Sequence, residues 1–214
     1  MVKLTKEQIY GENRLSREEK IKMFEELLIS TNRPGVDKII QFLRDTDFYR
    51  APASAKYHSN YDGGLMDHSM MVYSVACSFA ESLGEIDPES KQQFKEDSII
   101  LSCLLHDVCK CCMYVAAKKW KKDDDNMWIQ YDGYDIQDTF PIGHGEKSVI
   151  MLTRIGLELD PCEMLAIRYH MGLWGETNKE FVSQQKSAIE ICKLVLLVQM
   201  ADHSASQMFE PTIE

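Results

Sequence analysis

The segment Leu104-Leu105-His106-Asp107-Val108-Cys109-Lys110 places an adjacent histidine and aspartate near the end of an apolar run with helical periodicity. Three further histidines and one aspartate fit around this pair in chain order: His68, His144, His170 and Asp202. Each of the six interrupts or ends a stretch whose apolar pattern predicts burial, and buried ionisable groups are costly unless they are paired or bind metal. Imidazoles and carboxylates together suit divalent metals of intermediate hardness, such as iron, manganese or zinc. The six residues therefore predict a dinuclear metal site inside a helical bundle.

Most of the remaining sequence also predicts helices. Ser16-Arg17-Glu18-Glu19 has the pattern of a capping box. Asp87-Pro88 and Asp160-Pro161 each place a capping aspartate before a proline at the first helical position. We expect helices over residues 16–30, 36–44, 65–83, 96–110, 144–156, 161–170 and 184–209. The predicted fold class is all-α, a helical bundle with a small β-hairpin insertion.

The insertion is predicted between residues 114 and 131. Aromatic and β-branched residues in Tyr114–Ala116 and Met127–Tyr131 flank the charged turn Lys121–Asn126, which is typical of a β-hairpin. The hairpin lies in the sequence between the His-Asp pair and His144. Two interpretations stay open, a flap near the site or a solvated ribbon packed on the bundle.

Helical periodicity places three of the candidate ligands on apolar faces. His68 shares a face with Val72 and Val75, and Asp202 shares one with Val195 and Val198. His106 follows Ile99 and Cys103 with the same spacing. A single histidine on an apolar face is more often a satisfied core residue, so the metal interpretation depends on the six residues together. Adjacent residues on a helix project about 100° apart, so His106 and Asp107 can share a site only if it lies between their directions. We expect His203 to point away from the face of Asp202.

Composition limits the classes of partner. The 214 residues carry a net charge of −10, so any polyanionic substrate must be met by a local patch and not by the whole surface. The longest strongly apolar stretch, Leu194–Val198, is far shorter than a membrane span. With no N-terminal signal in the sequence, we expect a cytoplasmic protein with no membrane partner. We also expect one compact unit, in which N-terminal helices from residues 1–50 pack on a core domain of residues 51–214.

Seven cysteines are present, and we expect them to be reduced thiols. Cys109, Cys111 and Cys112 cluster after the His-Asp pair but lack a second Cys/His pair at zinc-site spacing. We therefore interpret them as small buried apolar residues.

The ordered pattern H…HD…H…H…D resembles the HD-domain superfamily of metal-dependent phosphohydrolases. The flanking residues agree with this resemblance: Tyr57-His58, Gly63-Gly64-Leu65-Met66-Asp67-His68-Ser69, Gly143-His144-Gly145-Glu146-Lys147-Ser148 and Ala201-Asp202-His203-Ser204-Ala205-Ser206. Over residues 51–208 the chain is similar to the HD domain of certain 3′-to-5′ exoribonucleases. The segment Phe140-Pro141-Ile142-Gly143-His144 makes it similar to small stand-alone HD hydrolases of bacteria and phages.

The resemblance implies a ligand set and a chemistry. One metal would be held by His68, His106, Asp107 and Asp202. A second would be held by His144 and His170, with Asp107 as the bridge and a bridging hydroxide as the nucleophile. The expected cofactors are two divalent ions, iron or manganese first, with zinc, nickel, magnesium or cobalt as alternatives.

Further roles follow from the same resemblance. Lys110 could neutralise a phosphate oxygen, and His58 could act as the acid for the leaving group or contact the phosphate. Tyr57, Arg168 and Trp174 are candidate substrate-binding residues. The expected substrate is a nucleotide or a short or cyclic oligonucleotide, and not an extended duplex. Its base could stack on Trp174, or on Trp120 or Trp128 of the hairpin.

Two other functions use the same ligands. HD-domain di-iron oxygenases share the six-residue set, and a non-catalytic, metal-dependent binding module would also need it. The ligand types alone do not separate these alternatives, because iron suits both kinds of enzyme. The oligomeric state is left open.

Overall fold

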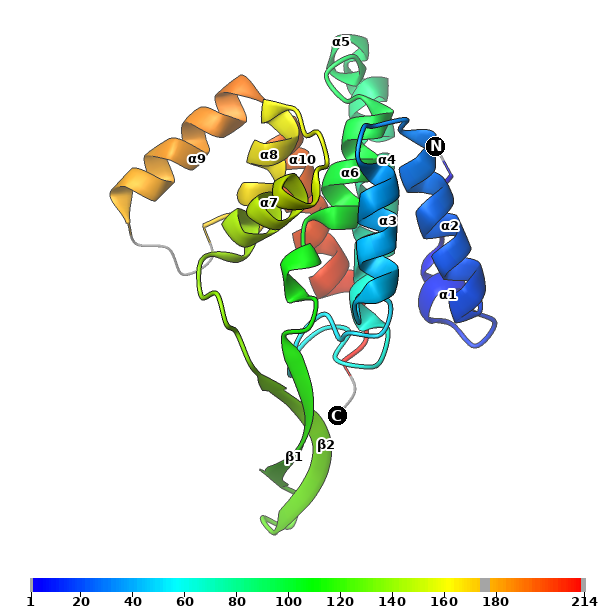
Figure 1. Ribbon diagram of the computed structural model, residues 1–214, viewed down its shortest axis with the longest axis vertical. Helices are drawn as coiled ribbons and strands as arrows, with labels where there is room; N and C mark the ends of the chain where they lie inside the picture. The colour runs from blue at the N-terminus through cyan, green and yellow to red at the C-terminus, as the bar shows by residue number, and fades with distance from the viewer. Residues whose placement is uncertain (1, 174–177, 213–214) are drawn as a thin grey trace.

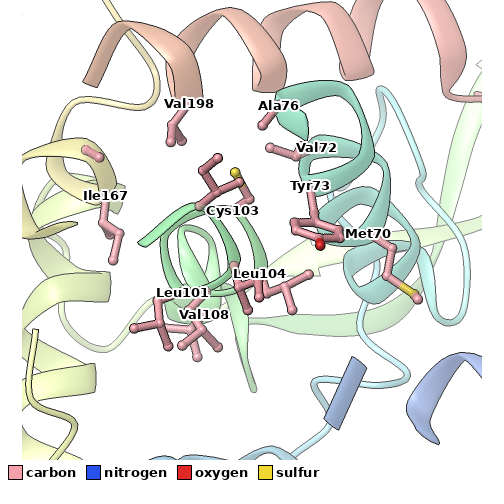
Figure 2. Packing of buried hydrophobic residues seen from close by; sticks show 14 of the residues in the cluster. Met70, Val72, Tyr73, Ala76, Leu101, Cys103, Leu104, Val108, Ile167 and Val198 are labelled. Atoms are coloured by element: carbon pink, nitrogen blue, oxygen red, sulfur yellow. The ribbon is translucent and has the colours of Figure 1, made fainter. Parts of the chain in front are cut away.

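The centre of the fold is formed by one long apolar helix and two shorter apolar helices that pack against it. The computed structural model describes residues 2–173 and 178–212 (Figure 1). Helix α4 (Gly64–Ile86) packs against both α6 (Glu96–Leu105) and α10 (Leu194–Ser204). Every residue of α6 from Ser98 to Leu105 is buried, as expected for a helix that is apolar on all sides. Figure 2 shows side chains of α4, α6, α8 and α10 meeting around this helix, including Tyr73, Leu104 and Val198.

The other elements surround this centre. They are α1 (Lys6–Tyr10), α2 (Arg17–Ser30), α3 (Val36–Asp45), α5 (Pro88–Lys91), η1 (Val108–Lys110, a 3₁₀ turn), β1 (Tyr114–Lys122), β2 (Trp128–Ile136), α7 (His144–Ile155), α8 (Pro161–Arg168), α9 (Lys179–Ile191) and η2 (Ala205–Phe209, a π-helical turn). The described residues are thus mostly helical with one two-stranded sheet, which confirms the predicted fold class.

The predicted helix starts are confirmed by their caps. The side chains of Ser16 and Asp160 accept hydrogen bonds from the backbone N–H groups of Glu19 and Glu163, and both form complete capping boxes. Asp87 accepts from the N–H of Glu89 in the same manner. These caps satisfy N–H groups that have no partner inside the helix.

Two of the expected helices end differently from the prediction. The helix expected over residues 96–110 ends at Leu105, because the backbone of Asp107 leaves the helical region with φ −106° and ψ 17°. The helix expected over residues 184–209 begins at Lys179 and is interrupted after Ile191, where Cys192 is extended with φ −138° and ψ 110°. It therefore divides into α9, α10 and the π-helical turn η2.

The prediction that the cysteines are all reduced is wrong for one pair. A disulfide joins Cys162 and Cys192, whose Cα atoms are 5.8 Å apart. The first turn of α8 and the break between α9 and α10 bring these residues together, and a separation of 30 residues gave no local sign of it. Cys109 and Cys111 are buried as predicted, whereas Cys112 is exposed.

The hairpin is confirmed and is longer than expected. Strands β1 and β2 pair antiparallel from Tyr114↔Ile136 to Lys122↔Trp128, and both faces are mostly exposed. Asp123 closes the turn, since its side chain accepts from the N–H groups of Asp125 and Met127. Figure 1 shows that the hairpin projects away from the helices, so only its base lies beside the bundle.

The N-terminal helices share the core of the rest of the chain. One hydrophobic cluster includes Ile9 and Phe24 as well as residues of α10. Buried ion pairs add to this packing, Lys20 with Asp67 of α4 and Arg33 with Glu163 of α8. A division into two units at residue 51 stays a prediction. Within the part of the chain that the structure describes, every helix is too short or too polar to cross a lipid bilayer.

Candidate metal centre

Five of the six predicted ligands converge where α4, α6, α8 and α10 meet. His68 lies on α4, His106 at the end of α6, and Asp107 directly after it. His170 follows the end of α8, and Asp202 lies on α10. The four other than Asp202 are buried, and the side chain of Asp202 is only 13% exposed. Because the helix ends before Asp107, the adjacent His106 and Asp107 can both face one centre.

The hydrogen bonds at one ring nitrogen determine what the other nitrogen offers. His106 Nδ1 donates to the carbonyl of Cys103 at 2.8 Å, and His170 Nδ1 donates to the carbonyl of Ile167 at 2.7 Å. His68 Nδ1 lies 2.6 Å from a carboxylate oxygen of Glu210 and is its donor. In a neutral imidazole the other nitrogen, Nε2, is then an acceptor. Three Nε2 lone pairs therefore face the centre.

Two carboxylates face the same point. His68 Nε2 is 3.3 Å from Asp202 Oδ1 and 3.6 Å from Asp107 Oδ2. His106 Nε2 is 3.5 Å from Asp107 Oδ2 and only 3.0 Å from His68 Nε2. Lone pairs and anionic oxygens this close repel one another unless a proton or a cation lies between them.

Two atoms of the centre are buried without a hydrogen-bond partner among the described residues. They are Asp107 Oδ1 and His170 Nε2, which are 3.5 Å apart. An unsatisfied buried acceptor is costly, and each such group in a native fold needs an explanation. A divalent cation would satisfy both atoms, and imidazole nitrogen with carboxylate oxygen is a donor set that iron, manganese and zinc accept. The donor set therefore fits a metal ion.

The electrostatics of the centre favour ionised carboxylates. Burial acts to raise the pKa of Asp107, but Lys110 and His106 outweigh it and hold that pKa well below its usual range. Burial likewise opposes ionisation of Asp202, whose pKa the neighbouring His68 and His106 lower. Burial acts to lower the pKa of His68, but Glu210 and Asp202 raise it to about 10.

Lys110 lies on the short turn η1 and contacts the same aspartate. Its Nζ is 2.6 Å from Asp107 Oδ2, and both side chains are buried. This ion pair fixes one oxygen of Asp107 and leaves the other, Oδ1, facing His170.

The sixth predicted ligand, His144, lies at the edge of the centre. It is the first residue of α7 and is half-buried, with Nδ1 3.9 Å from Cys109 Sγ. Three groups of described residues bring their ligand atoms within 4.8 Å of one another, and His144 belongs to none of them. Two of these groups consist only of predicted ligands, His68-His106-Asp202 and His106-Asp107-His170, and the third is His58-His68-Glu210.

The other residues predicted to contact the substrate do not converge on the centre as the ligands do. The ring of His58 lies 5.1 Å from that of His68, and burial together with His68 lowers the pKa of His58 to about 4. A neutral His58 favours the phosphate-contact alternative over the acid alternative. Tyr57 is 70% exposed, and the guanidinium of Arg168 is engaged by Glu146 at 3.0 Å. Trp174 lies outside the described residues. His203 is exposed, as expected.

The hairpin tryptophans lie far from the metal ligands. Tyr114, at the base of β1, is four residues from Lys110, but Trp120 is six residues further along the strand. At about 3.3 Å per residue this separation is roughly 20 Å. Trp128 pairs opposite Lys122, at the far end of the hairpin. Stacking of a substrate base on either ring stays a prediction.

Sequence reasoning missed one side chain that contacts a candidate ligand, Glu210. Its carboxylate is fully buried and contacts both His68 and the hydroxyl of Ser59, at 2.6 and 2.7 Å. Glu210 follows the last apolar helical stretch and precedes Pro211, so no periodic pattern marked it as buried.

The comparisons with known proteins agree with this centre. A sequence profile of the HD domain matches residues 65–206, about two thirds of the chain. The chain belongs to the HD domain family. The match includes all of the predicted metal ligands from His68 to Asp202.

A more specific similarity covers a smaller segment. Over 86 residues the chain is 31% identical to dihydroneopterin 2′,3′-cyclic phosphate phosphodiesterase of Methanocaldococcus jannaschii. The aligned segment is 40% of this chain and 31% of the archaeal protein, so the chain spans about a third of that relative. No solved structure matches.

Proposed function

We propose that this chain is a metal-dependent phosphodiesterase that hydrolyses a small phosphate ester. The observation that carries the proposal is the convergence of three imidazole lone pairs and two carboxylates, with Asp107 Oδ1 and His170 Nε2 left unsatisfied. Membership of the HD domain family and the similarity to a cyclic phosphate phosphodiesterase support it. The substrate class we propose is a nucleotide or a short or cyclic oligonucleotide, with a 2′,3′-cyclic phosphate as the first candidate.

The proposed centre holds two divalent ions. The first would be bound by His68, His106, Asp107 and Asp202. The second would be bound by His170 and His144, with Asp107 shared between them. The orientation of Asp107 supports this role, because Oδ2 faces His68 and His106 whereas Oδ1 faces His170. Such ions supply Lewis-acid activation of water and of phosphate oxygens.

The residues around the ions would bind and orient the phosphate. Lys110 has three N–H donors, and the contact with Asp107 uses one of them. We propose that another donor contacts a phosphate oxygen, which adds a positive charge in a chain of net charge −10. His58 keeps one N–H when neutral and would donate it to the substrate from beside His68. Both residues would thus recognise phosphate locally and without an extended basic surface.

The reaction itself is balanced without an oxidant. Water adds across one P–O ester bond: a P–O bond to the water oxygen forms, the P–O bond to the leaving oxygen breaks, and the leaving oxygen gains a proton. The product of a cyclic diester is a phosphate monoester with a free hydroxyl group. The proton that water releases is the one that the leaving oxygen gains, so the balance needs no further acceptor.

The test is hydrolysis of bis(p-nitrophenyl) phosphate and of nucleoside 2′,3′-cyclic phosphates. We expect turnover with Mn²⁺ or Fe²⁺, none with excess chelator, and no consumption of O₂. Asp107→Ala should abolish turnover, whereas His203→Ala, a change at an exposed neighbour of Asp202, should leave it intact. Stoichiometric oxygen uptake with an oxidised organic product would replace this proposal with a di-iron oxygenase. Metal-dependent binding of a phosphate ester without turnover would replace it with a binding module.

A further inference from the structure

Both ring nitrogens of His68 are contacted by one short C-terminal segment. Asp202 Oδ1 lies 3.3 Å from Nε2, the nitrogen that faces the metal centre. Glu210 Oε1 lies 2.6 Å from Nδ1, on the other side of the ring. Two carboxylates eight residues apart in the sequence thus enclose the same imidazole.

A local change of helix type shapes this segment. Helix α10 carries Asp202 and ends at Ser204, where the π-helical turn Ala205–Phe209 begins. The N–H of Glu210 then donates to the carbonyl of Ala205 at 3.2 Å, which closes the wider turn. π-Helical turns are rare in proteins, and those that occur are often found at functional sites. The segment returns toward α4 and brings Glu210 behind His68.

Glu210 is itself held in place from a second direction. Its Oε2 accepts from the hydroxyl of Ser59 at 2.7 Å, and the carbonyl of Pro211 accepts from the backbone N–H of Ser59 at 2.8 Å. Ser59 has a left-handed backbone with φ 46° and is fully buried. A Cβ on Gly64 would lie 1.9 Å from the Ser59 carbonyl oxygen, so only glycine permits this approach at the start of α4. The loop before α4 and the C-terminal segment therefore position one buried carboxylate together.

We infer that Glu210 is a positioning residue for metal binding, acting through His68. By accepting the Nδ1 proton, its carboxylate keeps the Nε2 lone pair directed at the centre and strengthens the imidazole as a ligand. Ser59 holds the carboxylate in the required orientation. His106 and His170 donate to backbone carbonyls instead, so of these three converging imidazoles it is His68 whose Nδ1 partner is a replaceable side chain. This inference rests on the metal site of the proposed function.

The test is the metal affinity of Glu210 variants, measured by competition with a chromophoric chelator. Glu210→Ala should weaken binding of Mn²⁺ or Co²⁺ about 10- to 100-fold, the range that loss of such a partner usually causes. Glu210→Gln keeps an oxygen that can accept from Nδ1 and should restore much of this loss. Ser59→Ala should cause a smaller loss in the same direction. The visible spectrum of bound Co²⁺ should change in Glu210→Ala and return toward wild type in Glu210→Gln.

A matched control separates positioning from a general loss of stability. Glu163 is also a fully buried carboxylate, but it pairs with Arg33 away from the metal ligands. Glu163→Gln should lower the melting temperature and leave metal affinity unchanged. If Glu210→Ala does not fold, the comparison of Glu210→Gln and Ser59→Ala with Glu163→Gln decides the question.

The outcomes distinguish this inference from the proposed function. If the Glu210 and Ser59 variants fold and bind the metal with the same affinity as the wild type, the positioning role alone is overturned. Equal weakening in Glu163→Gln would overturn it too, because the effect would then be one of general stability. A wild-type chain that binds no divalent metal would overturn the proposed function and this inference with it.

Discussion

The ion pair of Arg33 with Glu163 provides a quantitative test of how the N-terminal helices attach to the rest of the fold. Arg33 lies between α2 and α3, and its two terminal nitrogens donate to the two oxygens of Glu163, both at 2.7 Å. The Glu163 side chain is fully buried, and it also accepts from the Ser98 hydroxyl at 2.8 Å and the Asp160 N–H at 2.9 Å. Arg33→Ala would therefore leave a buried carboxylate with two neutral donors and no counter-charge.

The expected loss follows from this geometry. Removal of one partner of a buried, hydrogen-bonded ion pair costs about 3–5 kcal/mol, because the remaining charge is uncompensated. For a chain of this size each kcal/mol lowers the melting temperature by about 2–4 °C, so the total decrease should be roughly 6–20 °C. Urea denaturation and calorimetry of the metal-free protein measure these quantities.

Two further variants make the comparison specific. Lys22→Ala removes an exposed ion pair with Glu26, whose side chains are 75% and 62% exposed, and should cost less than about 0.5 kcal/mol. The double change Arg33→Met with Glu163→Met should regain part of the loss, since apolar residues of similar volume often replace a buried pair without penalty, whereas the Ser98 hydroxyl and the Asp160 N–H lose their acceptor. A loss below about 1 kcal/mol in Arg33→Ala would refute the reasoning. It would mean that the carboxylate is hydrated and that this contact does not join the N-terminal helices to α8.

Three other predictions concern titration, the disulfide and the hairpin. The pKa of His58 is about 4 in the folded chain against an ordinary 6.5, so between these pH values the unfolded chain binds a proton that the folded chain does not. The stability of the metal-free protein should therefore fall as the pH decreases from about 6.5 to 4, and His58→Gln should flatten that dependence in an acid denaturation series. Replacing Cys162 and Cys192 by alanine should lower the free energy of unfolding by about 3–4 kcal/mol, through release of the unfolded chain, and no loss under oxidising conditions would argue against the disulfide. Replacing Trp120 and Trp128 by alanine should leave the KM for a small cyclic phosphate unchanged, and a large increase would show that the hairpin tip reaches the substrate.

Local signals in the sequence predicted much of the fold. The capping boxes at Ser16 and Asp160 are complete within four residues, so their helix starts are local properties of the chain. Aromatic and β-branched residues on both sides of the charged turn at residues 121–126 predicted the hairpin for the same reason. The ligand set could be predicted because buried histidines and aspartates stand out in apolar helices, and five of the six residues converge.

The parts that the sequence did not predict depend on contacts between distant segments. The helix expected to continue to residue 110 ends at Leu105, because Asp107 turns toward His170 and Lys110, and no helix-breaking residue marks that end. The break at Cys192 accompanies a bond to Cys162, 30 residues away. Glu210 is buried only because a π-helical turn directs it to His68, and period-based reasoning does not anticipate such a turn.

The most direct test of the metal centre is the metal content of three purified proteins, measured by elemental analysis after loading with Mn²⁺ or Fe²⁺ and desalting. Asp107 is the proposed bridge, whereas His144 lies at the edge of the centre. The account predicts two metal ions per chain in the wild type, neither in Asp107→Ala, and one in His144→Ala. Retention of two metal ions per chain in Asp107→Ala would contradict it.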